Sequence, residues 1–113
     1  MREQHTMSAE EWRAVVGYEG LYEVSNLGRL RCLTRDGQLL PGHSIHGYRY
    51  VHLRKQGHSK HTSIHRLVAT AFIGPPPEGY ECNHKDFVRD NNVVGNLEWV
   101  THLGNIQHYW REG

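Results

Sequence analysis

The sequence has few cysteines and no hydrophobic segment of membrane-spanning length. Its 113 residues include two cysteines, Cys32 and Cys82, which lie far apart and form no Cys-x-x-Cys pair. This spacing argues against a thiolate zinc site and provides no disulfide framework. The N-terminus is polar and charged, without the apolar stretch of a signal peptide or membrane helix. Because reduced, partly buried thiols are typical of the cytoplasm, we expect a cytoplasmic protein with no membrane partner.

The formal net charge is only +1, but the charges are unevenly distributed along the chain. Residues 24–73 contain eight basic side chains and one acidic side chain, whereas residues 1–23 and 74–113 are both net acidic. A basic middle segment indicates a polyanion partner such as DNA, and the alternative is an ordinary solvated surface of mixed charge. Most such contacts would be made to phosphates, which position DNA without reading its sequence. The candidate DNA-binding residues are Arg29, Arg31, Arg49, Arg54, Lys55, Lys60 and Lys85.

Short strands separated by turns are predicted after residues 1–10, which we expect to be a flexible lead. The chain is long enough for one compact core. Alternation along residues 29–33 places Arg29 and Arg31 on one face of a strand and Leu30 and Cys32 on the other. We therefore predict a small, twisted antiparallel β-sheet with one packed face and one basic face.

A helix over residues 64–72 is predicted to follow this sheet, with Ser63 as its N-cap. The three prolines at 75–77 end it, because proline cannot continue the helical hydrogen bonds and restricts the residue before it. This stiff segment is the expected boundary between a β-rich DNA-binding part, residues 11–73, and a second part, residues 74–113.

The second part is predicted to be strand, loop, strand and helix. Residues 80–85 and 97–100 have strand character, and an Asp- and Asn-rich loop joins them. Thr101 is the expected N-cap of the final helix. The final helix is predicted to have a core-facing apolar stripe, formed at helical spacing by Leu103, Ile106 and Trp110.

Three polar side chains in this second part have a suggestive spacing. Asn96 lies twelve residues after His84, and Asn105 lies nine residues after Asn96. A histidine can take a proton from water near neutral pH. The amide oxygens of asparagines are hard, neutral donors suited to a magnesium-like cation that also binds phosphate. Together these groups indicate metal-assisted hydrolysis of phosphodiesters.

This spacing resembles the HNH motif, in particular that of HNH homing endonucleases from phages and introns, where the final position is often asparagine. The segments at residues 65–69, 96–101 and 105–108 agree with the flanking segments of that family. Residues 11–29 resemble the short N-terminal intron-nuclease motif that accompanies these enzymes. The resemblance implies an α+β fold, in which a small antiparallel β-sheet with a helix precedes a ββα-metal (HNH/His-Me finger) hairpin and helix.

The resemblance also implies the activity and the roles of the site residues. The chain would be a divalent-metal-dependent DNA endonuclease with His84 as general base and Asn96 orienting the loop. One Mg²⁺ or Mn²⁺ would be held by Asn83 and Asn105, and cleavage would leave a 5′-phosphate and a 3′-hydroxyl. Many relatives carry aspartate where this chain has Asn83. Because an amide adds no negative charge, we expect poor metal affinity until a DNA phosphate completes the site.

Several alternatives stay open at this stage. His65 suits packing at the start of the helix as well as phosphate contact, and His108 is expected to be a surface histidine more readily than an extra ligand. His58, His61 and His65 have a zinc-like spacing, but they straddle a change from strand to helix, so we do not expect a zinc site. A catalytically inactive DNA-binding regulator on the same scaffold is the alternative function. The sequence does not choose between nicking and double-strand cleavage, or between a homodimer and a partner protein as the source of specificity.

Overall fold

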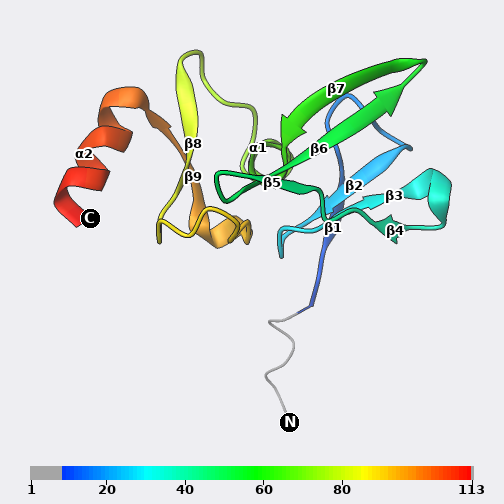
Figure 1. Ribbon diagram of the computed structural model, residues 1–113, viewed down its shortest axis with the longest axis horizontal. Coiled ribbons are helices and arrows are strands. Elements are labelled where there is room, and N and C mark those ends of the chain that lie inside the picture. Colours follow the sequence, from blue (N-terminus) through cyan, green and yellow to red (C-terminus); the bar gives the residue numbers. More distant parts are fainter. Residues whose placement is uncertain (1–8, 113) are drawn as a thin grey trace, which may run out of the picture.

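The computed structural model describes residues 9–112 of the chain, and the side chains of residues 9–108. Figure 1 shows two small β-sheets on one side of helix α1 (Ile64–Phe72), with a β-hairpin and a second helix on the other side. The expected α+β class is confirmed. Most of the predicted flexible lead, residues 1–8, lies outside the described residues. No helix in the described part is long and apolar enough to cross a membrane.

The first sheet is antiparallel and contains four strands in sequence order. Its strands are β1 (Trp12–Ala14), β2 (Tyr22–Ser25), β3 (Leu30–Cys32) and β4 (Gln38–Leu39), and a 3₁₀ turn, η2 (Leu33–Arg35), precedes β4. The predicted alternation is confirmed, since Leu30 and Cys32 are buried while Arg31 between them is half-buried.

The second sheet contains β5 (His43–Ile45), β6 (Tyr48–Lys55) and β7 (His58–Ser63), with the long β6 strand in the middle. The single sheet expected from the sequence is therefore divided into two. Val51 and Leu53 of β6 are 4% and 0% exposed and join the core, because alternation turns them toward the first sheet and α1.

Helix α1 has the predicted bounds and forms the centre of the core. Val68 and Ala69 are fully buried. Ser63 occupies the N-cap position with an extended backbone, but its buried hydroxyl makes no hydrogen bond. The helix ends where the backbone N–H groups of Ile73 and Gly74 both donate to the Ala69 carbonyl. Because α1 packs against strands on either side of residue 74, the proposed division there stays a prediction.

The C-terminal part is a ββα unit, as expected. It consists of β8 (Tyr80–His84), the 3₁₀ turn η3 (Val94–Asn96), β9 (Leu97–Thr101) and helix α2 (His102–Glu112). The Gly104 N–H donates to Thr101 Oγ1 over 2.9 Å, which confirms Thr101 as the helix cap.

The predicted core-facing stripe of α2 is wrong for the two members whose side chains are described. Leu103 is 64% exposed and Ile106 is 40% exposed. The Trp110 side chain lies outside the described residues. The reason is the position of α2, which packs against β8 and β9 at one end of the molecule, away from the central helix and the two sheets (Figure 1).

Candidate active site

His84, the last residue of β8, is held by a side chain of the following loop. Its Nε2 lies 2.9 Å from Asn92 Oδ1, and the two residues are 5% and 4% exposed. Because an amide oxygen only accepts hydrogen bonds, Nε2 carries the proton and Nδ1 carries the lone pair of the neutral ring. Nδ1 is therefore the atom of His84 that can accept a proton from water. Sequence reasoning missed Asn92, whose only signal was its place in a loop rich in Asp and Asn.

Aromatic rings surround His84 on the side of the central helix. His65 packs edge-on against it with ring centroids 4.8 Å apart, and the Tyr48 ring lies 5.8 Å away. Burial, followed by the neighbouring His84 and Arg66, lowers the pKa of His65 to about 3. His65 is thus neutral at pH 7, and its buried Nδ1 has no hydrogen-bond partner. These observations favour the packing alternative for His65 over phosphate contact.

Asn96 ties the segment after His84 to the end of the loop. Its Oδ1 accepts from the Asp86 N–H over 3.1 Å, and its Nδ2 donates to Asp86 Oδ1 and to the Asn91 carbonyl, both over 2.9 Å. Its own carbonyl accepts from the Lys85 N–H over 2.8 Å. These bonds hold the backbone after His84 against the end of the loop, as expected of a residue that orients the loop. The orienting role itself stays a prediction.

A turn of the N-terminal sheet fixes the same loop from the other side. Gly28 has a φ of +86°, and a Cβ placed on it would lie 2.6 Å from the backbone carbon of Asn92. Two residues earlier, the Asn26 carbonyl accepts from the Val94 N–H over 2.9 Å. Glycine is required here both by the positive φ and by the close approach of the loop. The N-terminal part therefore helps to position Asn92 and, through it, His84.

The two predicted metal ligands, Asn83 and Asn105, are each held by a carboxylate. Asn83 Nδ2 donates to Glu98 Oε2 and Asn105 Nδ2 donates to Glu81 Oε1, both over 2.7 Å. Glu81 also lies 2.9 Å from His102 Nδ1, and the bonds from Asn105 and His102 lower the pKa of its carboxyl group. Neither glutamate was predicted from the sequence. The carbonyl oxygen of each amide, the atom that a cation would bind, takes no part in these bonds.

This donor set fits a hard divalent cation. Amide and carboxylate oxygens are the ligands that Mg²⁺ and Mn²⁺ prefer. Asn83 stands where aspartate is more common and carries no charge. Glu81 and Glu98 supply negative charge next to the amides in its place.

The contacts of the three predicted groups lie on two faces of β8. Asn83 lies on the same face of β8 as Glu81, which accepts a hydrogen bond from Asn105 of α2, whereas His84 lies against Tyr48 and His65. Neighbouring residues on a strand are expected to point to opposite faces in this way. A reacting phosphate would therefore have to lie at the end of β8, between the two faces.

Two of the predicted DNA-binding arginines are already paired within the protein. Arg29 forms a bidentate ion pair with Glu10, and this hydrogen bonding lowers the pKa of Glu10 to about 2. Arg31 donates to Glu23 over 2.6 Å and lies 4.0 Å from the ring centroid of Trp12. Their charges are compensated by acidic residues near the N-terminus, which argues against their assignment as main phosphate contacts.

The other basic candidates lie in varied surroundings. The Lys55 ammonium group donates to the Gly17 carbonyl over 2.7 Å. Arg49 is half-buried and lines a hollow of about 250 Å³ together with Asp90 and Asn92. Like Lys55, the candidates Arg54, Lys60 and Lys85 have exposed side chains.

His108 belongs to the surroundings of the same site. Its ring stacks on Phe87 with centroids 4.8 Å apart, and its Nε2 lies 3.2 Å from the Lys85 carbonyl. It thus contacts the backbone directly after His84.

Comparisons with known proteins agree with this arrangement. Residues 10–54 match the NUMOD4 motif, and residues 63–107 match the HNH endonuclease family. The chain is 40% identical over 105 residues to DNA endonuclease I-HmuI of Bacillus phage SP01, covering 91% of this chain and 59% of that protein. It is 36% identical over 98 residues to the uncharacterized HNH endonuclease L245 of Acanthamoeba polyphaga mimivirus, covering 87% of this chain and 29% of that protein.

A solved structure is also similar. It is described as DNA binding and cleavage by the HNH homing endonuclease I-HmuI, and it matches with a TM-score of 0.83 and 38% identity over 91% of this chain and 59% of that chain. The chain thus spans between 29% and 59% of the length of these relatives.

Proposed function

This chain belongs to the HNH endonuclease family, and from that membership and the geometry of His84 we propose that it is a divalent-metal-dependent DNA endonuclease. The observation that carries the proposal is the buried contact between His84 Nε2 and Asn92 Oδ1, which leaves Nδ1 as the basic atom. The proposed reaction is hydrolysis of a phosphodiester bond of DNA, with a 5′-phosphate and a 3′-hydroxyl as products.

The part played by His84 follows from its tautomer. Nδ1 accepts a proton from a water molecule as that water attacks the phosphorus. Such general-base help contributes roughly 10²–10⁴-fold to the rate. Asn92 holds the ring in the correct tautomer, and the bonds of Asn96 hold the segment that follows it.

Asn83 and Asn105 are the proposed ligands of one Mg²⁺ or Mn²⁺. When bound, the ion would neutralise charge that develops on the phosphate and on the leaving 3′ oxygen. Glu98 and Glu81 hold the nitrogen end of each amide, and so fix the direction of each carbonyl oxygen. Their negative charge also lowers the electrostatic cost of bringing the cation to a site without aspartate.

The proposed partner is DNA, whose phosphates would be contacted by the exposed basic residues. Lys85 directly follows His84, and Arg89 lies over the Tyr48 ring, 5.1 Å from its centroid. Such contacts position the duplex but do not specify a sequence, so the assay below uses DNA of general sequence.

Supercoiled plasmid provides the direct test. We expect the purified chain to convert it to nicked or linear DNA in Mg²⁺ or Mn²⁺, with no conversion when a chelator is present in excess. The ratio of nicked to linear product reports whether one strand or both are cut. Binding of plasmid without metal-dependent cleavage, across pH 6–9 and with both ions, would instead identify a catalytically inactive DNA-binding regulator.

A further inference from the structure

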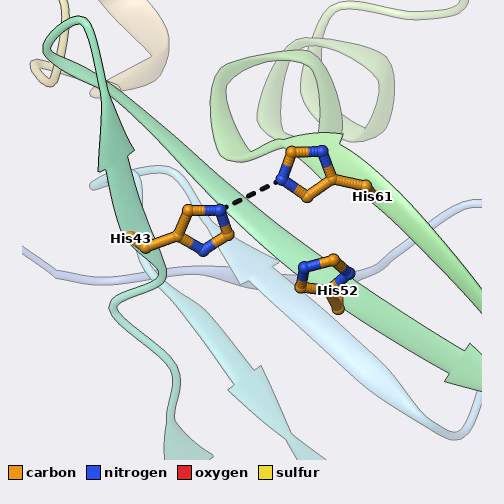
Figure 2. A group of neighbouring side chains, drawn as sticks. All are labelled: His43, His52 and His61. Atoms are coloured by element: carbon orange, nitrogen blue, oxygen red, sulfur yellow. Dashed lines mark hydrogen bonds between the residues drawn. The ribbon is translucent and has the colours of Figure 1, made fainter.

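Three exposed histidines lie together on the second sheet, apart from the candidate active site. His43, His52 and His61 come from β5, β6 and β7, and their rings converge above one face of the sheet (Figure 2). His52 and His61 are directly opposite each other across the β6–β7 pair. His43 is opposite Tyr50, two residues before His52, so alternation places all three imidazoles on the same side.

The distances between these imidazoles are close to those of a metal centre. The Nε2 atoms of His43 and His61 are 3.1 Å apart, and one ligand nitrogen from each of the three rings lies within 4.8 Å of the others. In a tetrahedral zinc site with Zn–N bonds of about 2.0–2.1 Å, ligand nitrogens are about 3.3 Å apart. Only a rotation of exposed side chains is therefore needed to bring the three nitrogens onto one ion.

Neutral imidazole is the form that binds metals. In this cluster, desolvation, followed by the nearby His52 and His43 rings, lowers the pKa of His61, a shift that favours the neutral form of this ring.

We propose that His43, His52 and His61 form a binding site for Zn²⁺ or a similar transition-metal ion, with the fourth position open to water. Three imidazole nitrogens suit Zn²⁺, Cu²⁺ or Ni²⁺ and are poor ligands for Mg²⁺, which prefers oxygen. The site is therefore chemically distinct from the oxygen-rich site around Asn83 and Asn105. It would join all three strands and hold the edge strand β5, whose three residues are all exposed, against β6.

This site differs from the zinc spacing considered from the sequence. His58 is three residues from His61 on the same strand and so points to the opposite face, and His65 is buried in α1. Neither reaches the cluster. The sheet register, which sequence reasoning did not provide, brings His43 and His52 to His61.

Calorimetric titration of the full chain with Zn²⁺, after removal of metal by chelator, tests the proposal. We expect one ion per chain at this site, with affinity reduced tenfold or more in each of His43→Ala, His52→Ala and His61→Ala. The matched control is His58→Ala, an exposed histidine on the opposite face of the same strand, which should bind as tightly as the wild type. Asn105→Ala should also bind normally, because it affects only the proposed nuclease site.

Circular dichroism without metal checks that each variant is folded, and the three replaced side chains are all exposed. Substitution of Co²⁺ for Zn²⁺ adds a spectroscopic readout, since a tetrahedral site should absorb strongly in the visible range in the wild type and in His58→Ala. The proposal is overturned if the wild type binds no Zn²⁺ at micromolar concentrations. It is equally overturned if His61→Ala binds as tightly as the wild type, or if His58→Ala loses binding to the same degree.

Discussion

The contact between Asn92 and His84 makes a prediction that separates a catalytic histidine from a structural one. Asn92→Ala removes the acceptor of a buried N–H group whose hydrogen bond is 2.9 Å long. An unsatisfied buried donor costs about 1–3 kcal/mol of folding free energy. The imidazole would also lose the partner that fixes its tautomer, so the cleavage rate should fall by roughly 10–100-fold, by analogy with the loss of a hydrogen-bond partner that orients a metal-ligating histidine.

Asn92→Asp is the more discriminating substitution, because it keeps the size and the acceptor but adds a negative charge. A carboxylate next to His84 stabilises the protonated imidazole, which cannot act as a base. The acid limb of the pH–rate profile should therefore move to higher pH by about 1–3 units. Near pH 9 the variant should approach the wild-type rate, whereas at pH 7 it should be much slower.

Initial rates of plasmid cleavage between pH 5 and 9, at saturating Mg²⁺, provide the assay. Asn91→Ala is the matched control, since Asn91 is the neighbouring residue and its side chain bonds to Asp86 over 2.8 Å. Its profile should keep the wild-type midpoint. DNA binding and urea unfolding of each variant identify losses that come from folding or affinity. If the Asn92→Asp profile superimposes on that of the wild type, the tautomer assigned to His84 is wrong.

Three further predictions follow from other contacts. Gly28→Ala should unfold at a lower urea concentration than Gly57→Ala. Both glycines have a positive φ, which costs alanine about 1–2 kcal/mol. Of the two, only Gly28 also lies against the backbone of the loop that follows β8. Equal losses would contradict the close approach. The pKa of His65 is lowered to about 3, so the stability that comes from keeping its ring neutral is complete above about pH 6.5. It is lost as the pH falls toward 3, by up to about 1.4 kcal/mol per pH unit. His65→Phe should therefore reduce the acid-side dependence of the free energy of unfolding on pH, measured by urea melts. A variant with the same acid slope would refute the assignment. Glu98→Gln should raise the Mg²⁺ concentration for half-maximal cleavage by roughly 10–100-fold with little change at saturation, because it removes charge beside Asn83. An unchanged Mg²⁺ requirement would exclude that role.

Local patterns made the elements of this fold predictable. The bounds of α1 follow from an apolar stripe between Ser63 and Gly74, and both ends of the helix are where the sequence places them. The hairpin and the cap at Thr101 were likewise predicted from strand alternation and a capping residue. The stripe of α2 was not, because helical spacing shows which residues share a face but not whether anything covers that face.

The site was predictable only in part, for a similar reason. His84, Asn96 and Asn105 are recognised by their spacing in one segment. Asn92, the partner of His84, lies in a loop that contacts the turn at Gly28, which is far away in sequence, so its position depends on tertiary packing. The glutamates behind the amides depend on the register of the hairpin and the path of α2. The internal pairing of Arg29 and Arg31 was not foreseen, because the total charge of a segment does not show which of its charges the fold pairs; their contact with DNA stays a prediction.

The central claim is that one imidazole activates the water that cleaves DNA, and His84→Ala tests it most directly. Cleavage and DNA binding should be measured in the same samples, at equal protein and Mg²⁺ concentrations. We expect the cleavage rate to fall by at least about 10²-fold with DNA affinity unchanged, and added imidazole to restore part of the rate. Cleavage by the folded variant at close to the wild-type rate would contradict the account.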